Sequence, residues 1–109
     1  MMAELLGATP SAGHAVFRCS DDGTRWVASG ALTFANAGAV LAATRQLPLP
    51  STGVIECDGI TAADSAAVAL LLSLKRRAAK VGAAITFVDT PAVLTTLAVL
   101  YGVEDLLKA

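Results

Sequence analysis

Ser65 is the residue whose type and position most clearly favour chemistry in this sequence. It follows Asp64 and stands where a long apolar helix should begin, after a short apolar strand at 54–57 and a loop at 59–63. The first backbone N–H groups of a helix have no partner inside the helix, and the helix dipole makes this end positive. A hydroxyl at such a place can hydrogen-bond to a partner or accept a phosphate. Ser65 is therefore the centre of the candidate site.

The sequence gives little support for catalysis at Ser65. A hydrolase with Ser65 as its nucleophile would need a positioned base, and the only histidine, His14, falls in a predicted strand near the N-terminus. Asp58 and Asp64 flank the predicted loop, but sites for hard cations need more oxygen ligands. Asp64 is better explained as a helix cap or a loop anchor. No P-loop motif is present. We expect a protein that is not an enzyme and has no metal or cofactor.

Length, composition and charge limit the class of protein. The chain has 109 residues, enough for one hydrophobic core, and 55% of them are hydrophobic. A formal net charge of −1 argues against a protein that binds nucleic acid, which would need a basic face. No stretch has the roughly 20 apolar residues of a membrane span, and the N-terminus lacks the pattern of a signal peptide. We expect a cytoplasmic domain at 13–109, preceded by a flexible arm at 1–12.

The two cysteines, Cys19 and Cys57, are far apart in the sequence and have no CxxC spacing. A disulfide scaffold or a zinc site is therefore not expected. Cys57 lies within an apolar strand pattern, and we interpret it as a small buried hydrophobic residue.

The predicted elements alternate in a way that defines the fold class. Strands are predicted at 14–19, 25–30, 54–57 and 84–88, and helices at 36–46, 65–81 and 91–100. The turn at 21–23 joins the first two strands into a hairpin, and Asn36 is a candidate cap of the first helix. The segment 103–107 should pack back onto the domain. The order predicts an α/β fold, in which a mixed β-sheet with an N-terminal hairpin and β-α repeats has helices packed on it.

The helix predicted at 65–81 is more apolar than a surface helix needs to be. A helical wheel gives it one continuous stripe that should face the sheet, formed by Ala67, Leu70, Leu71, Leu74, Ala78 and Val81. Val68 and Leu72 fall beside this stripe. The apolar arc therefore spans roughly 200°, where a surface helix needs little more than about 100°.

Two explanations of this wide arc remain open. Neighbouring helices of the same layer cover both of its edges, or the edge that contains Ser65 docks another protein at i, i+3, i+7 spacing. Small residues beside Ser65 would let a partner backbone approach closely. The predicted partner-binding residues are Asp64, Ser65, Ala66, Val68, Ala69 and Leu72.

The pattern from Asp58 to Leu72 resembles the signature of the STAS domain, a family that includes anti-sigma factor antagonists and the tails of sulfate transporters. The resemblance covers about residues 14–108, and its signature lies in Asp58, Ile60, Asp64, Ser65 and the run 68–72. The family often has glycine two residues after the Ser or Thr, where this chain has Ala67. The resemblance implies a STAS-like fold and a module that binds other proteins.

Within this family, the segments 64–82 and 95–107 are similar to the MlaB-like branch, small cytoplasmic subunits of ABC-type phospholipid transporters that maintain outer-membrane lipid asymmetry. This resemblance implies that the chain docks on the ATPase subunit through a contact at Ser65 and supports its assembly and activity. The chain would then lie at the cytoplasmic face of the inner membrane through its partner.

The alternative implied by the family is an anti-sigma factor antagonist. Phosphorylation of Ser65 would then switch binding to an anti-sigma factor kinase. The two roles share one mechanism, because a phosphate would add a charge of about −1.5 to −2 at the contact and can abolish docking.

Overall fold

The computed structural model describes residues 16–108, so the arm predicted at 1–12 and His14 lie outside the described residues. The elements are β1 (Phe17–Cys19), β2 (Arg25–Leu32), α2 (Ala37–Thr44), β3 (Val54–Ala63), α3 (Ser65–Lys80), β4 (Thr86–Val88), α4 (Ala92–Leu100) and α5 (Glu104–Lys108). Their order is the one predicted, with α5 added. No helix in this part of the chain is long and apolar enough to cross a membrane.

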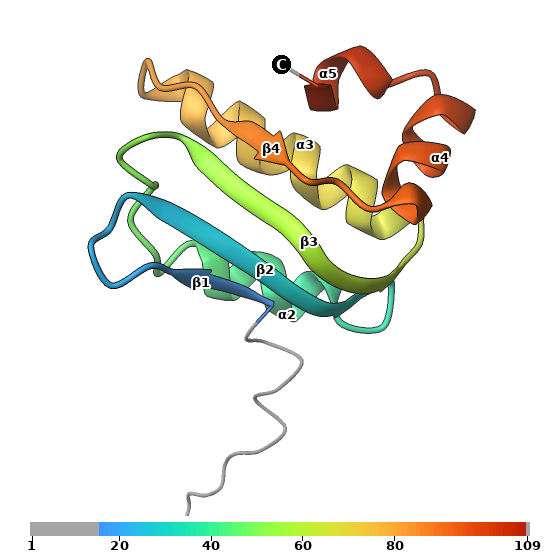
Figure 1. Cartoon of the computed structure of the whole chain (residues 1–109), viewed down its shortest axis with the longest axis horizontal. Coiled ribbons are helices and arrows are strands. Elements are labelled where there is room, and N and C mark those ends of the chain that lie inside the picture. Colours follow the sequence, from blue (N-terminus) through green and yellow to red (C-terminus); the bar gives the residue numbers. More distant parts are fainter. Residues whose placement is uncertain (1–15, 109) are drawn as a thin grey trace, which may run out of the picture.

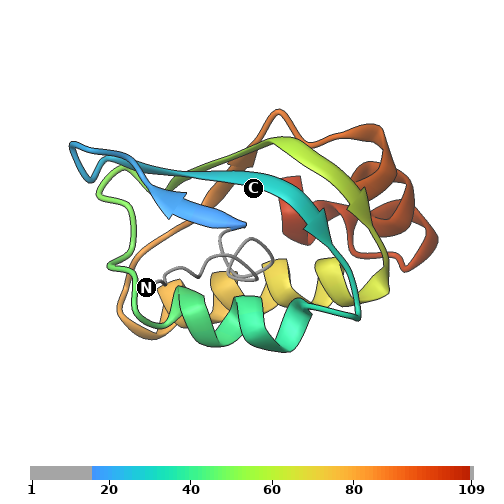
Figure 2. The same ribbon diagram turned by 90° about the horizontal axis from the view of Figure 1, so that it is seen from below.

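The four strands form one mixed sheet in the order β1-β2-β3-β4 (Figure 1). β1 is antiparallel to β2, whereas β2, β3 and β4 are parallel. The predicted α/β fold with an N-terminal hairpin is confirmed. Because β2-α2-β3 and β3-α3-β4 advance in the same direction across the sheet, right-handed connections place both helices on the same face. Figure 2 shows α2 and α3 side by side on that face.

The core lies between the sheet and its helices. Trp26, Ile55 and Leu71 are fully buried there, and Leu94 of α4 joins them. The indole Nε1 of Trp26 donates a hydrogen bond of 2.9 Å to the carbonyl oxygen of Pro48, so its one polar group is paired. The Trp26 indole thereby ties the loop after α2 to the sheet.

The third strand is longer than predicted. β3 runs through Ala63, so the expectation of a loop at 59–63 is wrong. Its pairing with β2 shifts register twice, which breaks the apolar alternation that identifies a strand. Gly59 lies where β2 approaches closely, because an added Cβ would be 2.6 Å from the carbonyl oxygen of Ala28. β3 thus includes the whole segment that was expected to be a loop, and it ends at Ala63, immediately before Asp64.

The start of α2 differs from the prediction in its capping. Asn36 does not cap this helix with its side chain. Its Oδ1 accepts a hydrogen bond of 2.9 Å from the Thr33 N–H, and its Nδ2 donates one of 2.8 Å to the Ala31 carbonyl oxygen. Asn36 therefore holds the turn that precedes the helix, a local bonding pattern that competes with capping in Asn side chains.

The long helix α3 has neighbours on both edges, as the first explanation of its wide apolar arc requires. It contacts α2 on one side and α4 and α5 on the other. The sheet-facing stripe is buried as predicted over Ala67, Leu70, Leu71, Leu74 and Ala78. Val81 is the exception, since it is 69% exposed at the C-cap, where the backbone has left the helical conformation. In α5, Leu107 is buried, which confirms that the C-terminal segment packs back.

Candidate functional site

Asp64 joins two segments at the start of α3. One carboxylate oxygen accepts a hydrogen bond of 2.9 Å from the Ala66 N–H, which caps the helix. The other oxygen accepts one of 2.9 Å from the Phe34 N–H in the turn before α2. Asp64 is therefore both the helix cap and the loop anchor that the sequence predicted, and it fixes this turn against the end of α3.

Ser65 is the first residue of α3, and its side chain is exposed. Because Asp64 already caps the helix, the Ser65 hydroxyl is not needed for capping. It makes no hydrogen bond within the part of the chain that the structure describes. The hydroxyl is therefore available to a partner or to a modifying enzyme.

The remaining predicted partner-binding residues lie in different environments. Ala69 is exposed, whereas Ala66 and Leu72 are partly exposed. Val68 is only 4% exposed, so its expected place on an exposed edge is wrong; it belongs to the core, where α4 and α5 flank this side of α3. Leu72 lines a shallow cavity with Leu106 of α5. Leu72 and the two alanines therefore belong to different surfaces.

Ala66 and Ala69 face a groove between α2 and α3, hereafter the α2–α3 groove. Its apolar half is a cavity of about 210 Å³, lined by Ala37, Gly38, Leu41, Ala66, Ala69, Leu70 and Ser73. Most of these side chains are small, so the backbone or a bulky side chain of a partner can approach closely. Phe34 stands in the turn that leads into α2 and is 85% exposed. Sequence reasoning missed Phe34, although an aromatic residue among small and polar neighbours was a signal.

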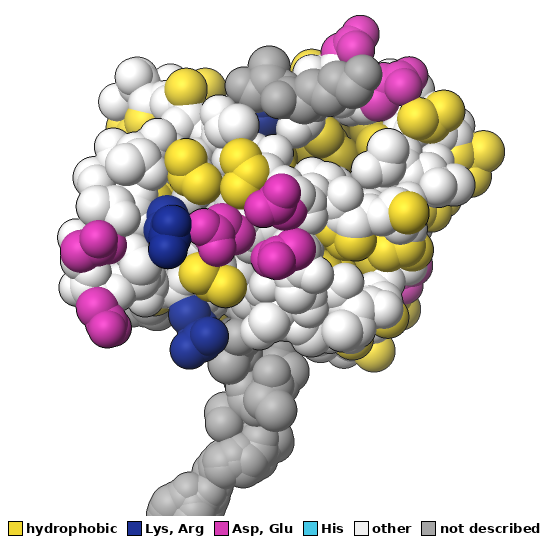
Figure 3. All heavy atoms as spheres, viewed as in Figure 1, with side chains coloured by type: hydrophobic (Ala, Val, Ile, Leu, Met, Phe, Trp, Pro, Cys, Tyr) yellow, Lys and Arg dark blue, Asp and Glu magenta, His cyan; other side chains and the backbone are white. Residues whose placement is uncertain are grey.

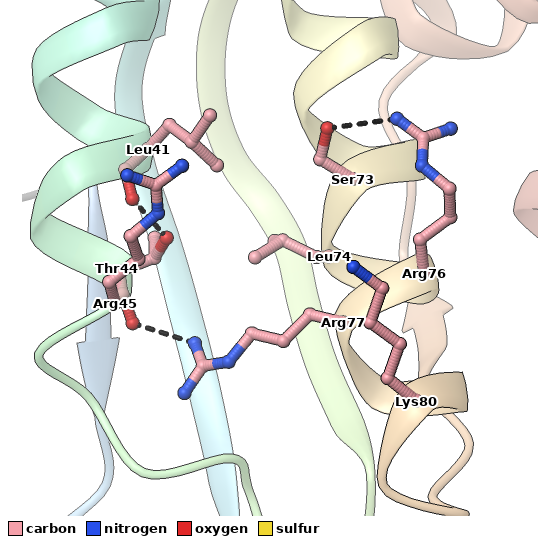
Figure 4. Close-up of a pocket in the computed structure, with 8 residues that line it drawn as sticks. All are labelled: Leu41, Thr44, Arg45, Ser73, Leu74, Arg76, Arg77 and Lys80. Atoms are coloured by element: carbon pink, nitrogen blue, oxygen red, sulfur yellow. Dashed lines mark hydrogen bonds between the residues drawn. The ribbon is translucent and has the colours of Figure 1, made fainter.

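The other half of the α2–α3 groove is basic. It is a cavity of about 390 Å³, lined by Leu41, Thr44, Arg45, Ser73, Leu74, Arg76, Arg77 and Lys80 (Figure 4). Leu41 and Ser73 line both cavities, so the two halves adjoin. Arg77 donates hydrogen bonds of 2.8 Å to the carbonyl oxygens of Thr44 and Leu47. It therefore satisfies carbonyl groups at the end of α2, a role across helices that sequence spacing did not reveal.

No group of three or more His, Cys, Asp and Glu side chains that could hold a metal occurs among residues 16–108. Cys57 is fully buried, as predicted, and burial raises the pKa of its thiol to about 12, with the nearby carboxylates of Asp58 and Asp89 acting in the same direction. A thiol with this pKa is protonated at neutral pH and is a poor nucleophile. The groups that remain suited to recognition are the Ser65 hydroxyl and the α2–α3 groove.

Comparison with known proteins agrees with the fold. A family model described as MlaB, STAS domain, matches residues 16–108. The chain belongs to this family. No curated protein matched the chain. The signature of this STAS domain is spread over the bulged strand and the helix start: Asp58 is exposed on β3, and Ala67, where the family often has glycine, is fully buried in α3.

Replacing Asp64 with alanine should lower the stability of this STAS domain by about 1–3 kcal/mol. The change removes an N-cap, worth about 1 kcal/mol, and leaves the Phe34 N–H without its acceptor. Urea unfolding of both variants measures the effect against Asp58→Ala, which removes an exposed carboxylate from β3 and should cost within about 0.5 kcal/mol. Equal stability of the two variants would contradict the double role of Asp64.

Proposed function

We propose that this STAS domain docks on the ATPase subunit of an ABC-type phospholipid transporter and supports its assembly and activity without catalysing a reaction itself. The observation that carries the proposal is the exposed Ser65 hydroxyl, which has no bond within the described chain and belongs to the residue just before Ala66 of the α2–α3 groove. Membership of the MlaB-like family supports a transporter as the setting. The chain would reach the cytoplasmic face of the inner membrane through this partner.

The surface around Ser65 has the properties of an interface centre. Phe34 offers a large aromatic side chain, a residue class enriched at the centres of interfaces. Its turn is held by the bond to Asp64, so little conformational freedom would be lost on binding. Ala66 and Ala69 provide the adjacent small surface. We propose Asp64, Ser65, Ala66 and Ala69 as partner contacts, with Leu72 at the margin.

Docking would support assembly by mass action. A protein that binds only the folded form of its partner stabilises that form, by about 2.7 kcal/mol when its free concentration is 100 times the Kd. The chain needs no catalytic group for this effect. Because Ser65 lies within this proposed contact, a charge or a bulky group added to it would switch off binding of the partner.

The exposed Ser65 hydroxyl also suits the second candidate, an anti-sigma factor antagonist regulated by phosphorylation. The two roles differ in partner. We expect an ABC ATPase subunit, and not an anti-sigma factor kinase, to co-purify with the tagged chain expressed at its native level and identified by mass spectrometry. The co-purified ATPase should be lost in Ser65→Arg. Recovery of the kinase in place of the ATPase would contradict the transporter role and favour the antagonist.

A further inference from the structure

We propose that the basic half of the α2–α3 groove receives an acidic segment of the partner protein. This inference rests on the proposed function and adds the chemistry of the segment that docks. Four of the eight Lys and Arg residues of the chain line this single cavity, and no acidic residue among the described residues 16–108 lines it. In a chain with a net charge of −1, such a concentration of positive charge defines a local field that an acidic partner would recognise.

The cationic side chains of this cavity differ in whether they already make hydrogen bonds within the chain. Arg77 donates from both terminal nitrogens to carbonyl oxygens at the end of α2 and in the loop that follows it, and Arg76 donates a hydrogen bond of 3.2 Å to the Ser73 Oγ. Arg45 and Lys80 are exposed and make no ion pair or side-chain hydrogen bond in the described part of the chain. These two side chains are therefore the ones available to carboxylates from outside.

The ends of the two helices do not account for so much charge. α2 ends at Thr44 and α3 ends at Lys80, so both negative helix ends lie at this cavity. Each end is equivalent to about −0.5 elementary charge, which gives roughly −1 in total. Four cations exceed that value, and the cavity remains positive after the helix dipoles are compensated.

The shape of the groove favours a protein segment over a small anion. The basic cavity of about 390 Å³ adjoins the apolar one of about 210 Å³, and a lone phosphate would leave the apolar half empty. An amphipathic segment fills both halves, with apolar side chains near Ala66 and Ala69 and carboxylates near Arg45 and Lys80. Figure 3 shows that acidic side chains of this chain gather on the open face of the sheet. Figure 2 shows α2 and α3 on the opposite face, so these acidic side chains lie on the other side of the sheet from the groove.

The test measures the affinity of the purified ATPase subunit of the transporter for three single charge reversals. Arg45→Glu and Lys80→Glu change the groove, and Arg18→Glu makes the same change at an exposed residue of β1. Each groove variant should bind about tenfold more weakly at low salt, mainly through slower association, and the loss should shrink to about threefold or less at roughly 0.5 M salt. Arg18→Glu should stay within about threefold of wild type.

The outcomes separate this inference from the proposed function. If Ser65→Arg weakens binding roughly 30-fold while the groove variants behave like Arg18→Glu, the docking role holds and the proposed acidic segment is wrong. If the wild-type protein does not bind the ATPase subunit, both the docking proposal and the acidic-segment inference are wrong. Perturbation of Arg45 and Lys80 NMR signals by millimolar inorganic phosphate, with ATPase binding unaffected by the charge reversals, would overturn the inference in favour of a small-anion site. Salt-dependent self-association lost in Arg45→Glu, with ATPase binding unchanged, would overturn it in favour of a second copy.

Discussion

Replacing Leu71 with aspartate is expected to unfold the protein. Leu71 is fully buried in the stripe of α3 that faces the sheet. The change removes a large apolar side chain, which costs about 2–5 kcal/mol, and buries a carboxylate without a partner, which costs several more. Because a small domain has only about 5–15 kcal/mol of stability, this sum removes most or all of it. Far-UV circular dichroism during thermal unfolding should show no cooperative transition.

The matched control is Ala69→Asp, two residues earlier on the same helix. Ala69 is exposed, so the new carboxylate stays in water and the cost is mainly the lower helix propensity of aspartate, about 0.7 kcal/mol or less. Ala69→Asp should therefore fold, although it alters the proposed contact surface. A cooperative transition of Leu71→Asp at a temperature near that of Ala69→Asp would contradict the assignment of the core face of α3.

Most of the fold was predictable because its signals are local. The apolar period of α3, the turn at 21–23 and the short apolar runs identified the elements, and their order identified the α/β class. The prediction failed in β3, where two register shifts relative to β2 break the alternation after Cys57. A bulged strand depends on its neighbour for its register, and that information is absent from the segment itself.

The candidate site was predictable where it depends on the helix start and not where it depends on tertiary contacts. Asp64 and Ser65 were identified because capping and exposure follow from their position at the end of the apolar pattern. Val68 was misplaced because the wheel cannot show how far α4 and α5 extend over its edge of α3. Phe34 and Arg77 were missed because their roles come from contacts with segments about 30 residues away in the sequence.

Replacing Ser65 with arginine should weaken binding of the ATPase subunit by about 2 kcal/mol or more, roughly 30-fold, as expected for a central interface residue. The long charged side chain would stand on the first residue of α3, next to Ala66 of the α2–α3 groove. Folding should be nearly unaffected, within about 0.5 kcal/mol, because Ser65 is exposed and Asp64 supplies the cap. Ser65→Glu should act in the same direction and imitates part of the charge of a phosphate.

Ser51→Arg is the matched control for this substitution. Ser51 is also an exposed serine, but it precedes β3, whereas Ser65 follows the other end of that strand. The same bulk and charge are thus added at the opposite end of β3 from Ser65. Ser51→Arg should bind the ATPase subunit as wild type does.

The most direct test of docking at Ser65 is a titration calorimetry series of the ATPase subunit with wild type, Ser65→Arg and Ser51→Arg, with the free energy of unfolding measured on the same samples. We expect a roughly 30-fold loss of affinity for Ser65→Arg alone, with equal stability of all three proteins. If Ser65→Arg instead destabilises the fold while its affinity per folded molecule equals that of wild type, Ser65 has only a structural role and the docking proposal is wrong.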